Sequence, residues 1–233
     1  MNMSAKAVFF DVDFTLICPG PMFRGEGYQA FCARYGMDVD PAVFVGAVAS
    51  AAPLLDGPDD RPYDAEIFVA YTRHIIEQMG GTGPNLDACA REMYAEWAAC
   101  QHFELYEEVP EVLRELAAAG VRIGLISNSH RCLASFQSHF DLQDLISATV
   151  SSSEHGFMKP HASIFSAALQ IVNVAAADAV MVGDSMRQDV EGALRAGMRA
   201  VLLQRGDTPT TSAAELGVPV IRSLRELPRL IIG

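Results

Sequence analysis

Short apolar runs recur along the chain and predict the buried strands of a parallel sheet. Strands that are covered on both faces read as continuous apolar runs, without the alternation of a half-exposed strand. We expect such strands at Ala7–Phe10, Val121–Ile126, Ala179–Val182 and Ala200–Leu203. The runs are bounded by polar residues and by glycine, so each is short enough to be a strand.

Between these runs, apolar residues recur at the three- and four-residue spacing of a helix that buries one face. Residues Pro110–Ala119 show this spacing after a proline in the first turn, and a glycine follows them. His161–Val172 repeats the pattern, and Ser185 to Gln188 predicts a capping box at the start of a helix that ends near Gly197. Strands that alternate with helices predict an α/β fold with a doubly wound, Rossmann-like parallel sheet.

The segment from about residue 17 to residue 104 has a different pattern. It shows no convincing buried strand, and its apolar residues recur at helical spacing, as in the series Tyr28, Phe31, Cys32 and Tyr35. We therefore expect a Rossmann-like core made of residues 1–16 and 105–233, with an inserted helical domain at residues 17–104.

The composition is that of an ordinary globular protein. Of 233 residues, 50% are hydrophobic and 20% are charged, and the longest apolar stretch, Phe44–Leu55, is 12 residues long and contains Pro53. A membrane span needs about 18 apolar residues, so none is expected. The amino-terminal residues lead straight into the first strand without a secretory signal, and we expect a cytoplasmic protein. The five scattered cysteines lack metal-binding spacing and are interpreted as buried thiols.

A formal charge of −12 argues against nucleic acid and anionic membranes as partners, because both are negatively charged. The same charge would repel a phosphorylated substrate unless a metal or a local cation cancels it. The chain has 15 arginines but only two lysines, Lys6 and Lys159. The second of these stands before a proline near the predicted helix at His161.

Polar residues stand where the predicted strands end. Asp11 and Asp13 follow the first strand, Ser127 the second and Asp184 the third, while Lys159 precedes a helix. Ligands of open parallel sheets bind beyond the carboxyl ends of the strands, so we expect these side chains to form one site.

These residue types suit the transfer of a phosphoryl group. A carboxylate can act as the nucleophile, and Mg²⁺ prefers oxygen ligands and can bridge the nucleophile and the phosphate. An ammonium group neutralises charge, and a hydroxyl with backbone amides holds phosphate oxygens. A second carboxylate can protonate the leaving oxygen and then activate water.

Four segments, in this order along the chain, resemble the motifs of the haloacid dehalogenase-like hydrolase superfamily. The first, Asp11-Val12-Asp13-Phe14-Thr15-Leu16, is similar to the DxDxT[LV] motif; the others are Leu125-Ile126-Ser127-Asn128, Lys159-Pro160, and Val182-Gly183-Asp184-Ser185 through Asp189. The resemblance covers residues 7 to 205 and leaves the helical insertion free, where the family carries a helical cap. It implies a magnesium-dependent hydrolase of small phosphate monoesters that forms a phosphoryl-aspartate.

The resemblance also implies a role for each matching residue. Asp11 would be the nucleophile and a Mg²⁺ ligand. Asp13 would be the general acid and base, with its backbone carbonyl on the metal. Lys159 would neutralise the nucleophile and phosphate. Asp184 would be a further metal ligand, and Asp189 would support the metal site without touching the ion.

Four residues are predicted to contact the substrate or the nucleophile loop. Ser127 and the amide of Asn128 would bind the phosphoryl group, and Thr15 would brace the loop that carries the nucleophile. Arg24 follows the first motif closely and is our candidate for contact with an anionic leaving group. The cap would set the choice of a small phosphorylated metabolite, which the sequence does not name.

The first motif departs from the family at Phe14, where glycine is usual, and Gln188 stands where asparagine is common. Phe14 could narrow the site or pack on the cap, which keeps open a catalytically silent phospho-ligand binding or partner protein. A phosphomutase of the same fold also stays open, since it uses the same residues. A dehalogenase of this fold is disfavoured by Asp13, and a phosphonate-cleaving enzyme by the absence of lysine from residues 17–104.

Other readings of the same residues are weaker. A calcium loop starting at Asp11 would need glycine where Leu16 stands and a bidentate acid where Met22 stands. The GxGxxA match that begins at Gly25 lacks a preceding strand. The six histidines show no metal spacing and are interpreted as surface or loop residues.

Overall fold

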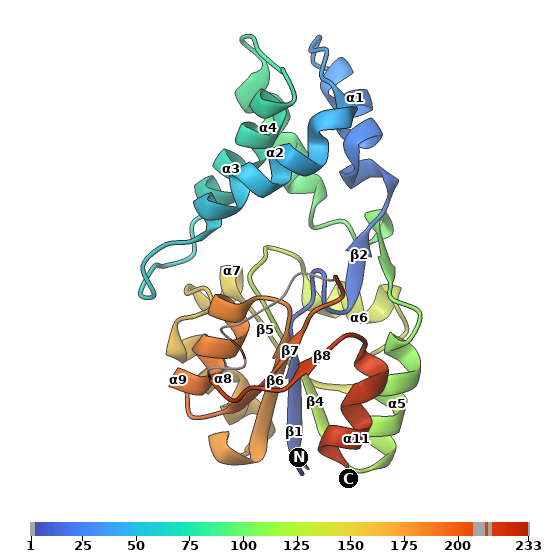
Figure 1. The fold of residues 1–233 in the computed structure, drawn as a ribbon, viewed down its shortest axis with the longest axis vertical. Coiled ribbons are helices and arrows are strands. Elements are labelled where there is room, and N and C mark those ends of the chain that lie inside the picture. The colour runs from blue at the N-terminus through green and yellow to red at the C-terminus, as the bar shows by residue number, and fades with distance from the viewer. Residues whose placement is uncertain (1–2, 207–212, 214–215, 233) are drawn as a thin grey trace. The chain divides into compact units, whose positions relative to one another are not determined.

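The computed structural model describes residues 3–206, 213 and 216–232. The chain forms two units (Figure 1): Met1–Cys18, Asp59–Pro62 and Leu105–Gly233 make up the first, and Pro19–Pro58 and Tyr63–Glu104 make up the second. The predicted domain boundaries and the role of residues 17–104 as a cap stay predictions.

The first unit contains a six-stranded parallel sheet with the order β5-β4-β1-β6-β7-β8. Its strands are β1 (Ala7–Phe10), β4 (Arg122–Ser127), β5 (Ile146–Ser151), β6 (Ala179–Gly183), β7 (Arg199–Leu203) and β8 (Val220–Ile221). Phe10 is in register with Leu125 of β4 and with Val182 of β6. The three central strands therefore end at the same level, and the residues that follow them meet at one edge.

Helices cover both faces of this sheet (Figure 1). On one side lie α8 (Ala162–Val172) and α9 (Gly192–Arg195), and on the other α5 (Val109–Ala118) and α11 (Leu227–Ile231). Alternate residues of a strand point to opposite faces of the sheet. Phe9 of β1 points to the face covered by α8, where it packs in one buried cluster with Phe165. The unit also contains α6 (Leu133–His139) and α7 (Ser152–His155). This confirms the predicted α/β fold with a doubly wound parallel sheet.

The predicted strands are present within one residue of their expected bounds, but two strands of the sheet were not predicted. The strand β5 lies at one edge of the sheet and its sequence is ISATVS, in which Ser147 is exposed and Thr149 partly exposed. An edge strand with polar residues lacks a continuous apolar run. At the opposite edge, β8 has only two residues, too few to give a pattern.

The second unit consists mainly of helices, namely α1 (Gly25–Ala33), α2 (Phe44–Ala51), α3 (Ala65–Gln78) and α4 (Leu86–Glu96). Tyr28, Phe31 and Cys32 of α1 are buried, as their helical spacing predicts. The insertion was predicted to be all helical, but a short, partly exposed strand stands at each end of residues 17–104, where β2 (Ile17–Pro19) pairs with β3 (Phe103–Leu105). Three-residue strands are too short to show periodicity. Among the described residues, no helix is long and apolar enough to cross a membrane.

Candidate active site

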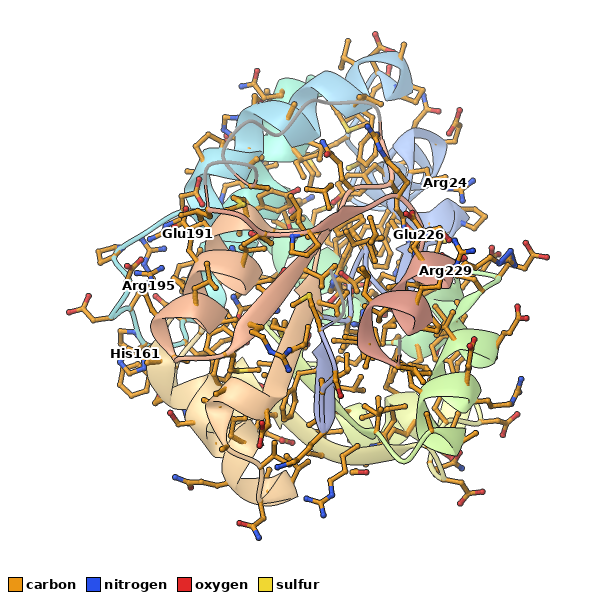
Figure 2. The ribbon with its side chains drawn as sticks, turned by 60° about the horizontal axis from the view of Figure 1, so that its bottom comes forward. Arg24, His161, Glu191, Arg195, Glu226 and Arg229 are labelled. Atoms are coloured by element: carbon orange, nitrogen blue, oxygen red, sulfur yellow. The ribbon has the colours of Figure 1, made fainter. Side chains whose placement is uncertain are left out.

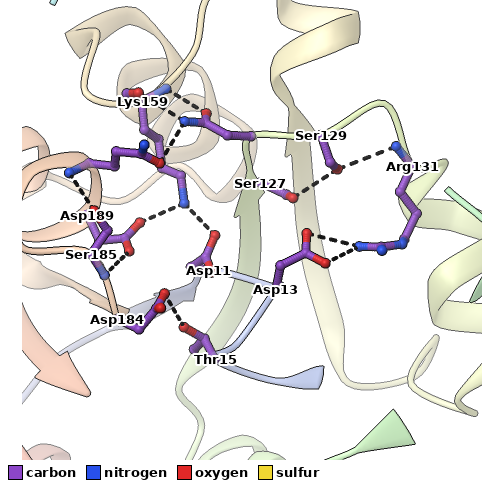
Figure 3. A network of polar contacts seen from close by, with 12 residues as sticks. Asp11, Asp13, Thr15, Ser127, Ser129, Arg131, Lys159, Asp184, Ser185 and Asp189 are labelled. Carbon is purple, nitrogen blue, oxygen red and sulfur yellow. Dashed lines mark hydrogen bonds and ion pairs between the residues drawn. The ribbon is translucent and has the colours of Figure 1, made fainter. Parts of the chain in front are cut away.

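The loop after β1 places Asp11 at the centre of a buried polar network (Figure 3). Its backbone N–H donates to the carbonyl of Val182 at 2.9 Å, which continues the pairing of β1 with β6 beyond the strand. The Nζ of Lys159 donates to Asp11 Oδ1 and to Asp189 Oδ1, at 2.6 Å in each case. Only 2% of the Lys159 surface is exposed, so this lysine is an interior cation held between two carboxylates.

The side chain of Asn128 fixes the backbone of Lys159. Its Oδ1 accepts from the Lys159 N–H at 2.7 Å, and its Nδ2 donates to the Lys159 carbonyl at 2.9 Å. Nδ2 also donates to Oε1 of Gln188 at 3.1 Å. The sequence predicted a role for the backbone amide of Asn128 and missed this role of its side chain, because the partner is 31 residues away.

The helix after β6 begins less regularly than the capping box predicts. Ser185 Oγ accepts from the Gln188 N–H at 3.1 Å, as expected, but the Gln188 side chain bonds to Asn128. The first turns, Met186–Glu191, form a π-helix before α9. This turn places Asp189 so that its Oδ2 accepts from the Ser185 N–H at 3.0 Å.

Three carboxylates gather at this edge of the sheet, from Asp11, Asp184 and Asp189. One oxygen of each lies within 4.8 Å of the others, close enough to hold a metal ion. Thr15 Oγ1 lies 3.5 Å from Asp184 Oδ1, so the loop after β1 contacts the residue that follows β6. A Cβ at Gly183 would lie 2.2 Å from the Asp189 carboxylate, so glycine is required there.

This cluster contains three carboxylates and one lysine. Burial raises the pKa of Asp11 well above its ordinary value; Lys159 opposes the rise, and the charges of Asp189 and Asp184 add to it. Desolvation and then Asp189 raise the pKa of Asp184 to about 7, although Asp184 keeps the most solvent contact of the three acids. For Lys159, burial lowers the pKa, but Asp11 and Asp189 outweigh it and the pKa is raised. One lysine therefore leaves excess negative charge that a divalent cation would neutralise.

A second polar cluster holds Asp13. The side chain of Arg131, which has no exposed surface, donates through Nη1 to both carboxylate oxygens of Asp13, at 2.9 and 3.1 Å (Figure 3). Ser127 Oγ lies 3.0 Å from Ser129 Oγ in the same loop. Sequence analysis did not identify Arg131, which stands in none of the four motifs and is 118 residues from its partner.

Phe14 adopts a left-handed backbone conformation with φ of 65°. Glycine adopts the left-handed conformation without steric cost. In any other residue the Cβ is crowded against the neighbouring backbone. Phe14 therefore carries backbone strain at a position where glycine would carry none. Its side chain is 45% exposed, and its predicted effect on the site stays a prediction.

Two further residues considered in the sequence have other hydrogen-bond partners. Arg24 stands at the start of α1 in the second unit (Figure 2), where its Nη2 donates to the carbonyl of Pro19 at 3.3 Å. Its contact with a substrate stays a prediction. His161, at the start of α8, accepts from the Ser163 N–H at 3.2 Å, so it acts as a helix cap.

Comparison with known proteins identifies the family. A family model of haloacid dehalogenase-like hydrolases matches residues 5–197, which include every residue of the two clusters. The chain belongs to the haloacid dehalogenase-like hydrolase family. The N-acylneuraminate-9-phosphatase of Rattus norvegicus is 31% identical, over 97% of this chain and 93% of its own length. This confirms the predictions of a haloacid dehalogenase-like hydrolase and of a phosphatase.

Solved structures of the family share the fold. A phosphatase of the family from Thermococcus onnurineus has a TM-score of 0.64 at 20% identity, covering 96% of both chains. A 2-haloacid dehalogenase from Pseudomonas syringae pv. Tomato DC3000 has a TM-score of 0.63 at 23% identity, covering 97% of both chains. Because enzymes of two reaction types share this haloacid dehalogenase-like fold, the reaction has to be argued from the site residues.

Proposed function

We propose that this haloacid dehalogenase-like phosphatase is a Mg²⁺-dependent hydrolase of small phosphate monoesters that works through a phosphoryl-aspartate on Asp11. The observation that carries the proposal is the buried ammonium of Lys159, 2.6 Å from both Asp11 and Asp189, beside the acid of Asp184. A nucleophilic carboxylate, a fixed cation and further oxygen ligands at the end of one sheet are what phosphoryl transfer requires.

The donor set fits Mg²⁺, which prefers carboxylate and carbonyl oxygens. The carboxylates of Asp11 and Asp184 and the carbonyl of Asp13 would hold the ion, which would neutralise charge between the nucleophile and the phosphate. Both oxygens of Asp189 accept hydrogen bonds, one from Lys159 and one from Ser185. This favours the predicted role of Asp189 as a support that does not contact the metal.

The residues of the chain divide the reaction into two steps. In the first, an oxygen of Asp11 bonds to phosphorus as the ester oxygen leaves, and Asp13 gives that oxygen a proton. In the second, water attacks the phosphoryl-aspartate and Asp13 takes the water's proton. Ser127, 1% exposed at the end of β4, and the Asn128 amide are proposed to hold the phosphoryl oxygens, with Thr15 bracing the loop.

The substrate is proposed to be a small phosphorylated metabolite, chosen by the helical unit acting as a cap. Because a relative that matches almost the whole chain is named for N-acylneuraminate 9-phosphate, that compound is the first to test. A panel of sugar, sugar-acid, amino-acid and triose phosphates should be screened beside it. A cytoplasmic location is proposed with it, since such metabolites are made inside cells.

Phosphate release measured with and without Mg²⁺ tests the function. We expect turnover in Mg²⁺, none in excess EDTA, and inhibition by Ca²⁺, whose larger and looser shell misplaces the nucleophile. Full turnover in EDTA would contradict the magnesium mechanism. A protein that binds phosphate esters but hydrolyses none in Mg²⁺ would be a silent binding protein, and one that returns an isomeric phosphate would be a mutase.

The two aspartates of the first motif test the intermediate. Asp11→Asn should abolish turnover, and Asp13→Asn should lower it about 10²–10⁴-fold, because a proton carrier is lost while the nucleophile remains. With a good leaving group, Asp13→Asn protein should accumulate an adduct of about 80 Da, the mass of a phosphoryl group. Intact-mass measurement after acid quench shows it. An adduct on the Asp11→Asn protein would show that Asp11 is not the nucleophile.

A further inference from the structure

Arg131 is a buried arginine outside the four motifs, in the loop between β4 and α6. Only 1% of its surface is exposed, and it is among the largest fully buried side chains of the described chain. A buried cation is tolerated in a protein interior where an anion or hydrogen bonds compensate its desolvation. Arg131 contacts an anion, Asp13, through Nη1 at 2.9 and 3.1 Å.

This contact fixes the orientation of the Asp13 side chain. A guanidinium has five N–H donors in a rigid fork, and a carboxylate accepts on both of its oxygens. Because Nη1 lies against both oxygens, the carboxyl group of Asp13 is held in one orientation beside the loop that follows β4.

The same loop orients the phosphate-binding serine. Ser127 Oγ lies 3.0 Å from Ser129 Oγ, which accepts from the backbone N–H of Arg131 at 3.4 Å. The two aspartates are thus held by different cations, Asp11 by Lys159 and Asp13 by Arg131. This arrangement keeps the nucleophile and the proton carrier apart in position and in charge environment.

We propose that Arg131 is a positioning residue, which orients the carboxyl group of Asp13 toward the water that hydrolyses the phosphoryl-aspartate. The inference rests on the proposed function and deepens it. In that step the water oxygen bonds to phosphorus while the bond from phosphorus to the Asp11 oxygen breaks. Asp13 takes the water proton, Asp11 returns as a carboxylate, and inorganic phosphate leaves. In this proposal Arg131 acts through Asp13.

Arg131→Met tests this role, since methionine fills much of the space without the charge. We expect kcat to fall about 10- to 100-fold, because water activation loses its oriented base. KM should fall together with kcat, so that kcat/KM changes less than about threefold, because hydrolysis of the phosphoryl-aspartate becomes the slow step while substrate binding is not altered. The phosphoryl adduct should accumulate during turnover of an aryl phosphate. Arg131→Lys, which restores one donor, should recover part of the loss.

A double-variant cycle separates this role from a general structural one. In the Asp13→Asn background, Arg131→Met should change kcat less than about twofold, because the two residues act as one unit. Arg199→Met is the matched control: that guanidinium donates to the carbonyls of Met3 and Ser4, both at 2.9 Å, and its loss should leave kcat unchanged. Folding is compared by circular dichroism. If Arg131→Met does not fold, the same cycle is run with Arg131→Lys.

The outcomes distinguish this inference from the proposed function. A wild-type protein without Mg²⁺-dependent turnover would refute the phosphatase proposal and the role of Arg131 together. An active wild type whose Arg131→Met variant keeps its kcat would refute the role of Arg131 alone. The role would also be refuted if Arg131→Met lowered kcat by the same factor in the Asp13→Asn background as in the wild type. A rise in KM at unchanged kcat would refute it too, and would make Arg131 a substrate-binding residue.

Discussion

The two lysines of the chain allow a matched test of the buried cation. Lys6 and Lys159 each form an ion pair at 2.7 and 2.6 Å, but the Lys6 side chain is 74% exposed and that of Lys159 only 1%. Replacing each with methionine removes one ammonium and keeps most of the apolar stem. The substitutions differ in burial and in the number of carboxylates that lose a partner.

The expected cost follows from the surroundings of each lysine. At an effective dielectric constant of about 20, opposite charges about 4 Å apart attract by about 4 kcal/mol, and Lys159 has two such partners, Asp11 and Asp189. In the Lys159→Met variant, folding no longer has to desolvate the ammonium group. The buried carboxylates, however, lose the positive charge that compensates them. Removing one partner of a buried pair costs about 3–5 kcal/mol, so we expect that loss for Lys159→Met. For Lys6→Met we expect about 0–1 kcal/mol, the range for exposed pairs.

The cost for Lys159→Met should depend on pH. Burial already raises the pKa of Asp11, and loss of Lys159 removes the group that opposes the rise. A carboxylate whose folded pKa exceeds its unfolded value destabilises the fold above that unfolded value, near pH 4, and not below it. The deficit should therefore be smaller at pH 5.5 than at pH 8. Mg²⁺ should recover part of it at pH 8 by supplying positive charge.

Equilibrium urea unfolding in EDTA, followed by circular dichroism, measures these free energies. Trp97, the single tryptophan, belongs to the second unit, so its fluorescence reports that unit separately. We expect Lys159→Met to shift the dichroism transition much more than the fluorescence transition. Equal, small losses for the two methionine variants would refute the reasoning, because they would show that Lys159 compensates no buried charge. A Lys159→Met deficit that is the same at both pH values would refute the electrostatic account.

Three further predictions concern single features of the site. Phe14→Gly should be more stable than Phe14→Ala by about 1 kcal/mol, because glycine relieves the left-handed conformation; equal thermal midpoints would contradict this. Gly183→Ala should weaken Mg²⁺ binding at least about tenfold in calorimetry, since its Cβ displaces Asp189, whereas Gly46→Ala, with open space around it, should not. Because the pKa of Asp184 is raised to about 7 and a protonated carboxyl does not ligate, Mg²⁺ affinity should fall about tenfold for each pH unit below 7 and level off above it; a flat profile from pH 5.5 to 8 would disprove it.

The sequence alone determined the elements whose signal is local. A buried parallel strand such as Ala7–Phe10 is apolar throughout, and a helix such as Ala162–Val172 repeats its apolar face. The residues at strand ends could be named because parallel strands in one sheet end at one edge, where Asp11 follows β1 and Ser127 ends the neighbouring β4. Local signals were absent for the edge strand β5 and for three-residue strands, so these were missed.

Only the tertiary structure decided which side chains pair. Asp13 could have faced solvent, and nothing within a few residues of Arg131 indicates that it reaches across 118 positions to hold that carboxylate. Asn128 likewise meets the backbone of Lys159 because β4 lies beside β5 in the sheet, and Lys159 stands between β5 and α8. Charge compensation in a protein interior acts through space, over a few ångströms, and chain order does not record those distances. The pattern of residues therefore specifies the layers, and packing specifies the partners.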